Sequence, residues 1–189
     1  MKIQQTKFDG VLVLTPNISE DSRGAFYESY SKREFLKNGI LHNFVQDNHS
    51  YNKHQYTFRG LHYQIKPNAQ TTLVRVVSGA IVDFVVDIRM GSPTFGQYIS
   101  EIISEQNHKQ ILIPEGFAHG FLTLTDNVNM LYKMDSFYSP DHDRILNFND
   151  PKIGINLGID IEKLTIAYKD KTSPFINNID NNFVYSSSN

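Results

Sequence analysis

The sequence TTLVRVVSGAIVDFVVDI, residues 71–88, decides the fold class of this chain. Residues 71–77 and 80–88 are dominated by β-branched and aromatic side chains, which favour strands. The Ser78-Gly79 pair between them is a short-turn signal and predicts that the two runs form a β-hairpin. Similar runs recur on both sides, separated by Gly, Pro, Asn and Asp, at residues 11–14, 25–30, 44–48, 98–103, 110–113, 120–124 and 129–138.

Many short strands with regular turn signals predict an all-β, antiparallel jelly-roll sandwich with a few short helices. Residues 31–38 carry the one clear helix signal, because Ser31 and Glu34 fit a capping box and Gly39 is placed to end the helix. A chain of 189 residues suits one domain, so we expect a single domain over 1–189. Residues 177–189 are rich in Asn and Ser and predict a flexible tail.

The composition argues against several classes of function. A formal net charge of −2 provides no basic field, so neither nucleic acid nor a membrane is an expected partner. The absence of cysteine excludes disulfides, thiolate metal sites and cysteine nucleophiles. Residues 1–10 lack the apolar core of a signal peptide, and no apolar run reaches membrane-spanning length. We therefore expect a soluble, cytoplasmic protein.

A second stretch, TFRGLHYQ at residues 57–64, carries candidate chemistry. Strict alternation would place Arg59 and His62 on opposite faces of a strand. The glycine between them often marks a β-bulge, which would bring both side chains to one pocket. Histidine suits proton transfer near neutral pH, and arginine suits phosphate or carboxylate. The alternative from these residues alone is a hydrogen-bonded core histidine beside a surface arginine.

Two earlier strands combine polar and aromatic side chains. Phe26 and Glu28 share a face of residues 25–30, which indicates either a binding surface or an edge strand with one wet face. The amides of Gln46 and Asn48 share a face of residues 44–48 and have the donors and acceptors to read a pyrimidine edge. They are equally suited to starting a polar loop at Asn48-His49-Ser50.

Two tyrosines stand out later in the chain. In residues 129–138 the alternation points Tyr132 and Tyr138 to the same face. Core tyrosines with bonded hydroxyls are the common alternative for such a pattern.

The motifs FVQDNHS, FRGLHYQ, LVRVVSG, SPTFGQ, IPEGFAHGF, LYK and NDPKIGI occur in this order. Their order resembles that of the dTDP-4-dehydrorhamnose 3,5-epimerases, the RmlC-like group of the cupin superfamily, over residues 10–174. The resemblance implies a cupin-type jelly roll and a dTDP-4-keto-6-deoxyhexose substrate whose product feeds surface polysaccharide. It also implies no cofactor and a homodimer with exchanged amino-terminal strands.

The resemblance assigns a role to individual residues of this chain. His62 matches the family's catalytic base, Tyr132 its general acid, and Asp170 the carboxylate that orients the base. Tyr138 matches the aromatic that stacks on the thymine. The residues implied in substrate binding are Arg23, Phe26, Glu28, Gln46, Asp47, Asn48, Arg59, Gln64, Thr72, His119, Tyr138, Asp143 and Lys169.

His119 lies in PEGFAHGF, the position at which many cupins supply a metal ligand. The first cupin metal motif, H-x-H, is absent, because the residue two after His62 is Gln64. Two isolated histidines make a weak metal site. We expect no metal, and His119 is interpreted as a neutral contact to the sugar or its phosphate.

Two positions depart from the family pattern. Thr72 stands where relatives have a lysine able to stabilise an enolate oxygen, so the enzyme is slower, another group takes that place, or one carbon is inverted. We favour inversion of one carbon, by a 3- or 5-epimerase acting on a related sugar. Asn156-Leu157-Gly158 replaces a Trp- and Pro-containing segment, which affects the expected path toward Asp170.

Two alternatives to an epimerase remain from the sequence. A non-catalytic nucleotide-sugar-binding jelly roll would not need His62, Tyr132 and Asp170 together. A metal-dependent cupin would need ligands that the sequence does not show.

Overall fold

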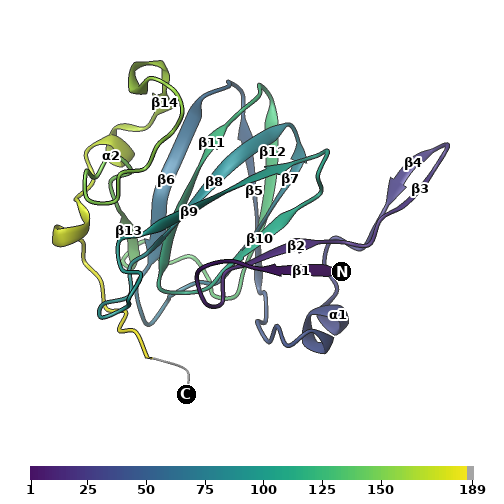
Figure 1. The fold of residues 1–189 in the computed structure, drawn as a ribbon, viewed down its shortest axis with the longest axis horizontal. Helices are drawn as coiled ribbons and strands as arrows, with labels where there is room; N and C mark the ends of the chain where they lie inside the picture. The colour runs from purple at the N-terminus through teal and green to yellow at the C-terminus, as the bar shows by residue number, and fades with distance from the viewer. Residues whose placement is uncertain (187–189) are drawn as a thin grey trace.

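Two β-sheets face each other in the computed structural model, which describes residues 1–186 (Figure 1). The first consists, in spatial order, of β1 (Lys2–Gln5), β2 (Leu12–Thr15), β10 (Gln110–Ile113), β7 (Thr72–Ser78), β12 (Val128–Met134) and β5 (Gln46–Asn52). The second consists of β13 (Asp143–Ile145), β6 (Thr57–Gln64), β11 (Phe117–Thr123), β8 (Ala80–Asp87) and β9 (Tyr98–Ser104). Neighbouring strands in both series pair antiparallel, so the predicted jelly-roll class is confirmed.

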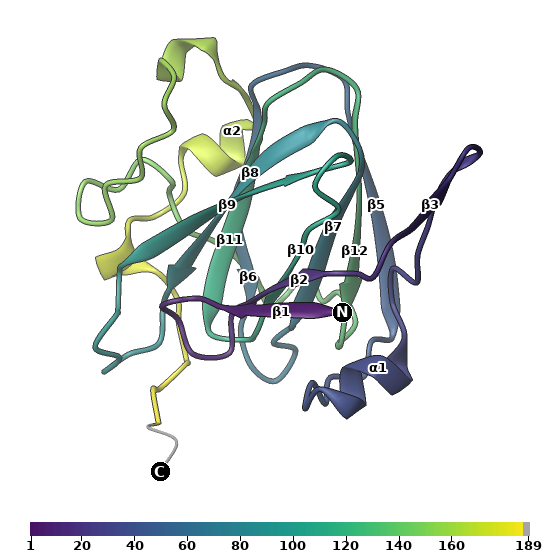
Figure 2. The same cartoon turned by 45° about the vertical axis from the view of Figure 1, so that its right-hand side comes forward.

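Smaller elements lie outside the two sheets. A hairpin of β3 (Ser19–Asp21) and β4 (Gly24–Phe26) projects from the body, as Figures 1 and 2 both show. β14 (Thr165–Ile166) pairs in parallel with β6. The helices are α1 (Lys32–Lys37), α2 (Tyr168–Lys171) and the 3₁₀ turns η1 (Ile161–Lys163) and η2 (Ile176–Asn178). Within residues 1–186, none of these helices has the length and apolar character to cross a membrane.

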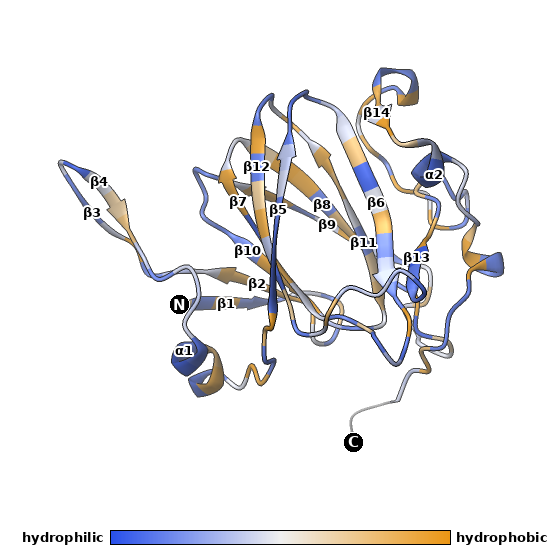
Figure 3. Ribbon diagram, turned by 180° about the vertical axis from the view of Figure 1, so that it is seen from behind, coloured by the Kyte–Doolittle hydropathy of each residue, from blue (hydrophilic) through white to orange (hydrophobic). Residues whose placement is uncertain are grey.

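Alternation along the strands builds hydrophobic cores on both faces of the second sheet. Val76 of β7 and Val85 of β8 belong to the core between the sheets. Phe58 and Leu61 of β6 belong to a second core, where Phe148 packs on the outer face of the second sheet. Figure 3 shows hydrophilic and hydrophobic residues alternating along β6. Each fully buried side chain of this kind contributes about 1.5–3 kcal/mol, so the sheets form a rigid support for polar residues on β6 and its neighbours.

Ser78-Gly79 is a crossover between the sheets, and the predicted hairpin is wrong. β7 pairs with β10 and β12 in the first sheet, whereas β8 pairs with β11 and β9 in the second. Gly79 has φ +80°, which lets the chain turn sharply from one layer to the other. The same turn signal suits both connections, because strand pairing depends on distant partners.

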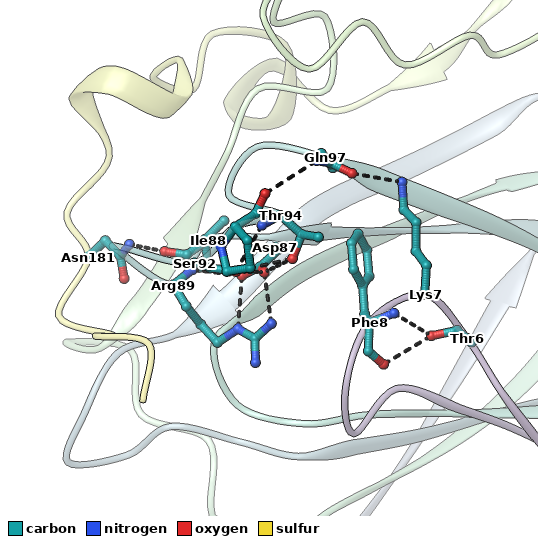
Figure 4. Close-up of polar contacts among 11 residues, drawn as sticks. Thr6, Lys7, Phe8, Asp87, Ile88, Arg89, Ser92, Thr94, Gln97 and Asn181 are labelled. Atoms are coloured by element: carbon teal, nitrogen blue, oxygen red, sulfur yellow. Dashed lines mark hydrogen bonds and ion pairs between the residues drawn. The ribbon is translucent and has the colours of Figure 1, made fainter. Parts of the chain in front are cut away.

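The C-terminal segment packs on the body, which corrects the expected flexible tail for the described residues. Ile176 and Phe183 are buried in the outer core, and Val184 forms a β-bridge with Met90. Asn181 donates to the carbonyl of Ile88, beside the Asp87 carboxylate that accepts from Arg89 (Figure 4). The amides of this Asn-rich segment are thus used for specific hydrogen bonds. Residues 187–189 lie outside the described residues.

Several predicted boundaries change. The helix expected over residues 31–38 is confirmed as α1, but Ser31 makes no side-chain capping bond. The strand expected over 25–30 ends at Phe26, and that expected over 129–138 ends at Met134. β5 continues through Asn48-His49-Ser50, where a loop was one of the alternatives, because β12 pairs along its whole length.

Candidate active site

A pocket opens between the two sheets. Strands of both layers contribute to it, together with the loop after β12 that carries Tyr138. The residues that line it are Asn48, His62, Tyr63, Gln64, Gln70, Thr72, Ile113, Phe117, His119, Tyr132, Met134, Tyr138 and Asp143.

A β-bulge in β6 sets the direction of two of the candidate residues. His62 is opposite His119 and Arg59 is opposite Phe121, so β6 holds one residue more than β11 between these pairs. Gly60 sits in the bulge with φ +126°, a conformation that favours glycine. The predicted bulge is confirmed. It turns Arg59 toward the facing sheet, where its Nε donates to Asn52 Oδ1 of β5 (2.8 Å).

Asp170 holds the imidazole of His62. His62 Nε2 lies 3.0 Å from Asp170 Oδ1, and the backbone N–H of Gly60 donates to Asp170 Oδ2 (3.1 Å). The short helix α2 brings this carboxylate to β6, and its side chain is 2% exposed. Burial alone would raise the pKa of the Asp170 carboxyl, but its bonds to His62 and Gly60 outweigh burial and lower that pKa. The carboxylate is therefore charged and stabilises a protonated His62.

Tyr132 faces this pair from the other layer. It lies on β12 of the first sheet, whereas His62 lies on β6 of the second, and both line the pocket. Burial raises the pKa of the Tyr132 hydroxyl, and the charge of Arg59 offsets part of that effect. Tyr132 is therefore a protonated phenol, and a ring bound between the sheets would have a base on one side and an acid on the other.

The polar residues near the mouth of the pocket form a connected set. Asn48 lines the pocket, and its Oδ1 accepts from Gln46 Nε2 (3.0 Å). Gln46 Oε1 accepts from the backbone N–H of Tyr138 (3.1 Å), whose hydroxyl lies 3.4 Å from an Asp143 oxygen. Gln64 Oε1 accepts from the N–H of Ser139 (2.7 Å) and so fixes the same loop. The ring of Tyr138 is 55% exposed, which leaves its face open for stacking.

Thr72 and His119 complete the interior of the pocket. Thr72 is 4% exposed, and its hydroxyl donates to Met134 Sδ (3.5 Å). His119 Nδ1 lies 3.4 Å from Oδ1 of the buried Asp83. Within residues 1–186, no group of three or more His, Cys, Asp or Glu side chains is arranged to bind a metal ion. The expectation of a metal-free site stays a prediction.

Seven predicted substrate-binding residues do not line this pocket. Two of them, Gln46 and Arg59, bond to Asn48 and Asn52 as described above. Arg23 pairs with Asp21 on the projecting hairpin (2.6 Å), and Asp47 accepts from Lys133 Nζ (2.8 Å). Lys169 borders a shallow surface groove next to Asp143. The other two, Phe26 and Glu28, border a separate cavity against α1. Their roles stay predictions.

Sequence reasoning missed Asp83 and Gln70. Asp83 is an acidic residue inside the apolar run Ile81-Val82-Asp83-Phe84-Val85, and that interruption was an available signal. Gln70 lines the pocket while its amide donates to the carbonyl of Ser136 (2.8 Å). It lies in a loop, where no periodicity marks a side chain that points inward.

Fold and pocket together define an acid–base enzyme on a cupin-type jelly roll. A sequence profile described as dTDP-4-dehydrorhamnose 3,5-epimerase matches residues 5–178. The chain therefore belongs to the dTDP-4-dehydrorhamnose 3,5-epimerase family. It is an isomerase-class enzyme of deoxysugar biosynthesis that epimerises a dTDP-4-keto-6-deoxyhexose.

Individual relatives agree over most of the chain. The dTDP-4-dehydrorhamnose 3,5-epimerase of Pseudomonas aeruginosa is 44% identical over 157 residues, which cover 82% of this chain and 86% of that protein. The corresponding protein of Sinorhizobium fredii is 39% identical over 188 residues, which cover 98% of this chain and 94% of that one. The crystal structure of dTDP-6-deoxy-D-glucose-3,5-epimerase from Legionella pneumophila, in complex with dTDP-4-keto-L-rhamnose, matches with a TM-score of 0.92. It is 37% identical, and the match covers 98% of this chain and 99% of that chain.

Proposed function

We propose that His62 and Tyr132 exchange protons with the carbons next to the C4 ketone of a dTDP-4-keto-6-deoxyhexose. The observation that carries the proposal is the arrangement of the pocket, where a carboxylate-bound histidine on β6 faces a partly buried tyrosine on β12. Epimerisation beside a ketone requires a base on one face of the sugar and an acid on the other. The two sheets provide these faces.

The reaction begins when His62 removes the proton from the carbon next to the ketone. The electron pair of that C–H bond moves toward the carbonyl and gives an enolate. Asp170 stabilises the imidazolium that forms, because it is already ionised and 3.0 Å from the ring. Tyr132 then gives its proton to the opposite face of the carbon, and the configuration is inverted.

The nucleotide is held by groups away from the reacting carbons. Gln46, Asn48 and the exposed ring of Tyr138 are suited to the thymine, through amide hydrogen bonds and stacking. Arg59 is suited to the diphosphate, since a guanidinium binds phosphate oxygens in pairs. Arg23 is assigned to the same diphosphate.

We infer a homodimer in which amino-terminal strands are exchanged. Arg23 and Phe26 lie on the β3/β4 hairpin, and Phe26 is 78% exposed. Figures 1 and 2 show this hairpin extending away from the sandwich. An exposed aromatic side chain on a projecting hairpin is suited to a second protomer, whose pocket it would help to close. The cytoplasmic location expected from the sequence stays a prediction.

The test is proton exchange followed by NMR. The purified protein is incubated in D₂O with dTDP-4-keto-6-deoxyglucose, and the signals of the protons at C3 and C5 are recorded separately. Loss of one or both signals, with the appearance of the inverted sugar, is the expected result. A folded protein that binds dTDP but exchanges neither proton would overturn the proposal in favour of a non-catalytic sugar-binding protein.

Thr72 favours a second candidate, an epimerase that inverts only one of the two carbons. Its hydroxyl is buried beside Met134, so this wall of the pocket offers at most a neutral donor to a developing enolate. A charge-assisted hydrogen bond is roughly twice as strong as a neutral one.

The Thr72→Lys variant tests this candidate. If the missing ammonium limits the reaction, lysine accelerates exchange at the slower carbon, and the C3 and C5 rates measured separately show it. Fast exchange at both carbons in the unmodified protein, with no gain from lysine, would exclude the one-carbon candidate.

A further inference from the structure

Asp83 is a buried acid that has no role in the reaction described above. Its side chain has no solvent exposure and lies on β8 between Ile81 and Val85, two residues of the apolar core between the sheets. Among the described residues, neither of its oxygens has a hydrogen-bond partner. Its charge contact is with His119, whose Nδ1 is 3.4 Å from Asp83 Oδ1 and also lacks a hydrogen-bond partner. Such a pair lowers stability, so it calls for a functional explanation.

Burial determines how many protons this pair carries. A charged carboxylate beside a neutral imidazole would leave a net negative charge in the apolar layer. Two arrangements avoid that charge: a protonated carboxyl that donates to Nδ1, or a carboxylate beside an imidazolium. Burial raises the pKa of the Asp83 carboxyl, and His119 offsets only part of the effect, which favours a neutral pair. In both arrangements Nε2 of His119 carries a hydrogen.

His119 is placed to direct that hydrogen into the pocket. Its ring lines the pocket with Nδ1 toward Asp83, so Nε2 is the nitrogen left for a ligand. His119 is directly opposite His62 on the neighbouring strand, which puts its donor next to the base. In the part of the chain that the structure describes, the pocket lining contains no lysine or arginine. His119 is thus the N–H donor placed directly beside His62.

We propose that Asp83 and His119 form the electrophile of the epimerisation: Asp83 keeps a hydrogen on Nε2 of His119, and this N–H donates to the C4 oxygen as it becomes an enolate. The inference rests on the proposed function and deepens it. His62 takes the proton and the C–H electrons move to oxygen, while His119 donates a hydrogen bond without transferring its proton. The carbonyl returns when Tyr132 protonates the carbon. His119 touches the reacting atoms, and Asp83 is a positioning residue that acts through it.

The protonation of His119 is tested without substrate. In protein labelled with ¹⁵N-histidine at neutral pH, Nε2 of His119 is expected to have the chemical shift of a nitrogen that carries hydrogen. A shift typical of an unprotonated ring nitrogen would overturn the proposal. This measurement does not depend on activity, so it remains decisive if the unmodified protein exchanges no carbon-bound proton and the proposed function itself fails.

Asp83→Leu separates a positioning role from a structural one. Leucine has a similar size and suits the apolar surroundings of Ile81 and Val85. We expect proton exchange to slow by about 10²–10³-fold, as for the loss of one oxyanion donor, with unchanged dTDP affinity. We expect Tm to stay the same or rise, since a buried polar acid in an apolar layer is replaced by an apolar side chain. Unchanged exchange, or a lowered Tm that accompanies the loss, would overturn the proposal.

A double-mutant cycle tests whether Asp83 acts through His119. The variant with Asp83→Leu and His119→Phe should exchange no more slowly than His119→Phe alone, because the carboxylate then has nothing left to orient. If the two substitutions reduce the exchange rate independently, Asp83 does not act through His119.

Discussion

At position 62 the orientation of one imidazole depends on a carboxylate more than a hundred residues later in the chain. We predict that His62→Ala slows proton exchange at every carbon of the sugar by about 10²–10⁴-fold, the usual cost of losing a general base. Affinity for dTDP should stay within a few-fold, because the thymine and diphosphate groups are assigned to other residues. NMR in D₂O and titration calorimetry with dTDP measure the two effects. Near-normal exchange in a folded variant would remove His62 from the mechanism.

The partly buried phenol of Tyr132 leads to a prediction about activity at alkaline pH. Burial raises the pKa of this phenol above its ordinary value of about 10, so the acid form predominates through neutral and mildly alkaline pH. We predict no loss of kcat/KM between about pH 7.5 and 9.5 that is due to Tyr132. Tyr132→Phe is the control: it should lower activity and leave the alkaline part of the profile unchanged. A descending limb that disappears in Tyr132→Phe would contradict this assignment.

The lowered pKa of Asp170 links the charge of its carboxyl group to the stability of the fold at low pH. Its folded pKa is lowered, so its ionised form contributes stability above the unfolded value of about 3.9, and this contribution is lost as pH falls through the folded value. The His62–Asp170 pair is therefore preserved throughout the neutral range.

The candidate acid and base could be proposed from the sequence more readily than the residues that support them. The local strand patterns of His62 and Tyr132 left a core role open, and the resemblance to the epimerase family assigned their roles, as it did that of Asp170. The burial of Asp170 depends on α2 docking against β6, which no local pattern encodes. Asp83 was missed because its partner, His119, lies on another strand.

At the scale of elements, the bulge in β6 depends on one glycine. A Cβ added to Gly60 would lie 2.5 Å from Gly120 Cα and 2.8 Å from the carbonyl oxygen of His119. We predict that Gly60→Ala lowers the free energy of unfolding by at least about 3 kcal/mol, since a clash with backbone adds to the strain of a positive φ. Urea titration measures the loss.

Gly24 is the matched control for this prediction. Its φ of +124° is close to the +126° of Gly60, but no atom lies within 4 Å of the position where a Cβ would be added. Gly24→Ala therefore reports the backbone strain alone, which we expect to cost about 1 kcal/mol. Equal losses of unfolding free energy in the two variants would show that the close contact between β6 and β11 at the bulge does not add to the cost of the substitution.

Element types were predictable where the signal is local, and their pairing was not. Strand periodicity gave the correct fold class, and the Ser31–Gly39 signals gave α1. The error at Ser78-Gly79 arose because a two-residue turn signal does not specify which strands pair. The C-terminal error arose because Asn and Ser are typical of both disordered tails and segments fixed by amide hydrogen bonds. Here Asn181 bonds to the carbonyl of Ile88.

At the scale of the whole molecule, residues that are assigned to one ligand lie in different parts of the protomer. Arg23 and Phe26 lie on the projecting hairpin, whereas His62 and Tyr132 lie inside the sandwich. If two protomers exchange their amino-terminal strands, each complete site combines the pocket of one chain with the hairpin of the other. The separation is then a consequence of assembly, and it can be tested by mixing chains with different defects.

We predict that a chain with Arg23→Ala and Phe26→Ala restores activity when it forms mixed dimers with a His62→Ala chain. In a mixed dimer, the intact pocket of the first chain receives the intact hairpin of the second. Each mixed dimer has one working site of two, so purified mixed dimers should show about half of the unmodified activity, and an unfractionated random mixture about one quarter. The chains are co-expressed with different tags, and dimers purified through both tags are assayed for exchange.

The control for this experiment pairs two chains that are both damaged in the pocket. Mixed dimers of His62→Ala and Tyr132→Phe contain no intact pocket, whichever chain provides the hairpin. Their activity should therefore equal the average of the two parent proteins. If the hairpin variant combined with His62→Ala also gives only the parental average, the nucleotide is bound within one protomer. Arg23 and Phe26 then have no part in the partner's site.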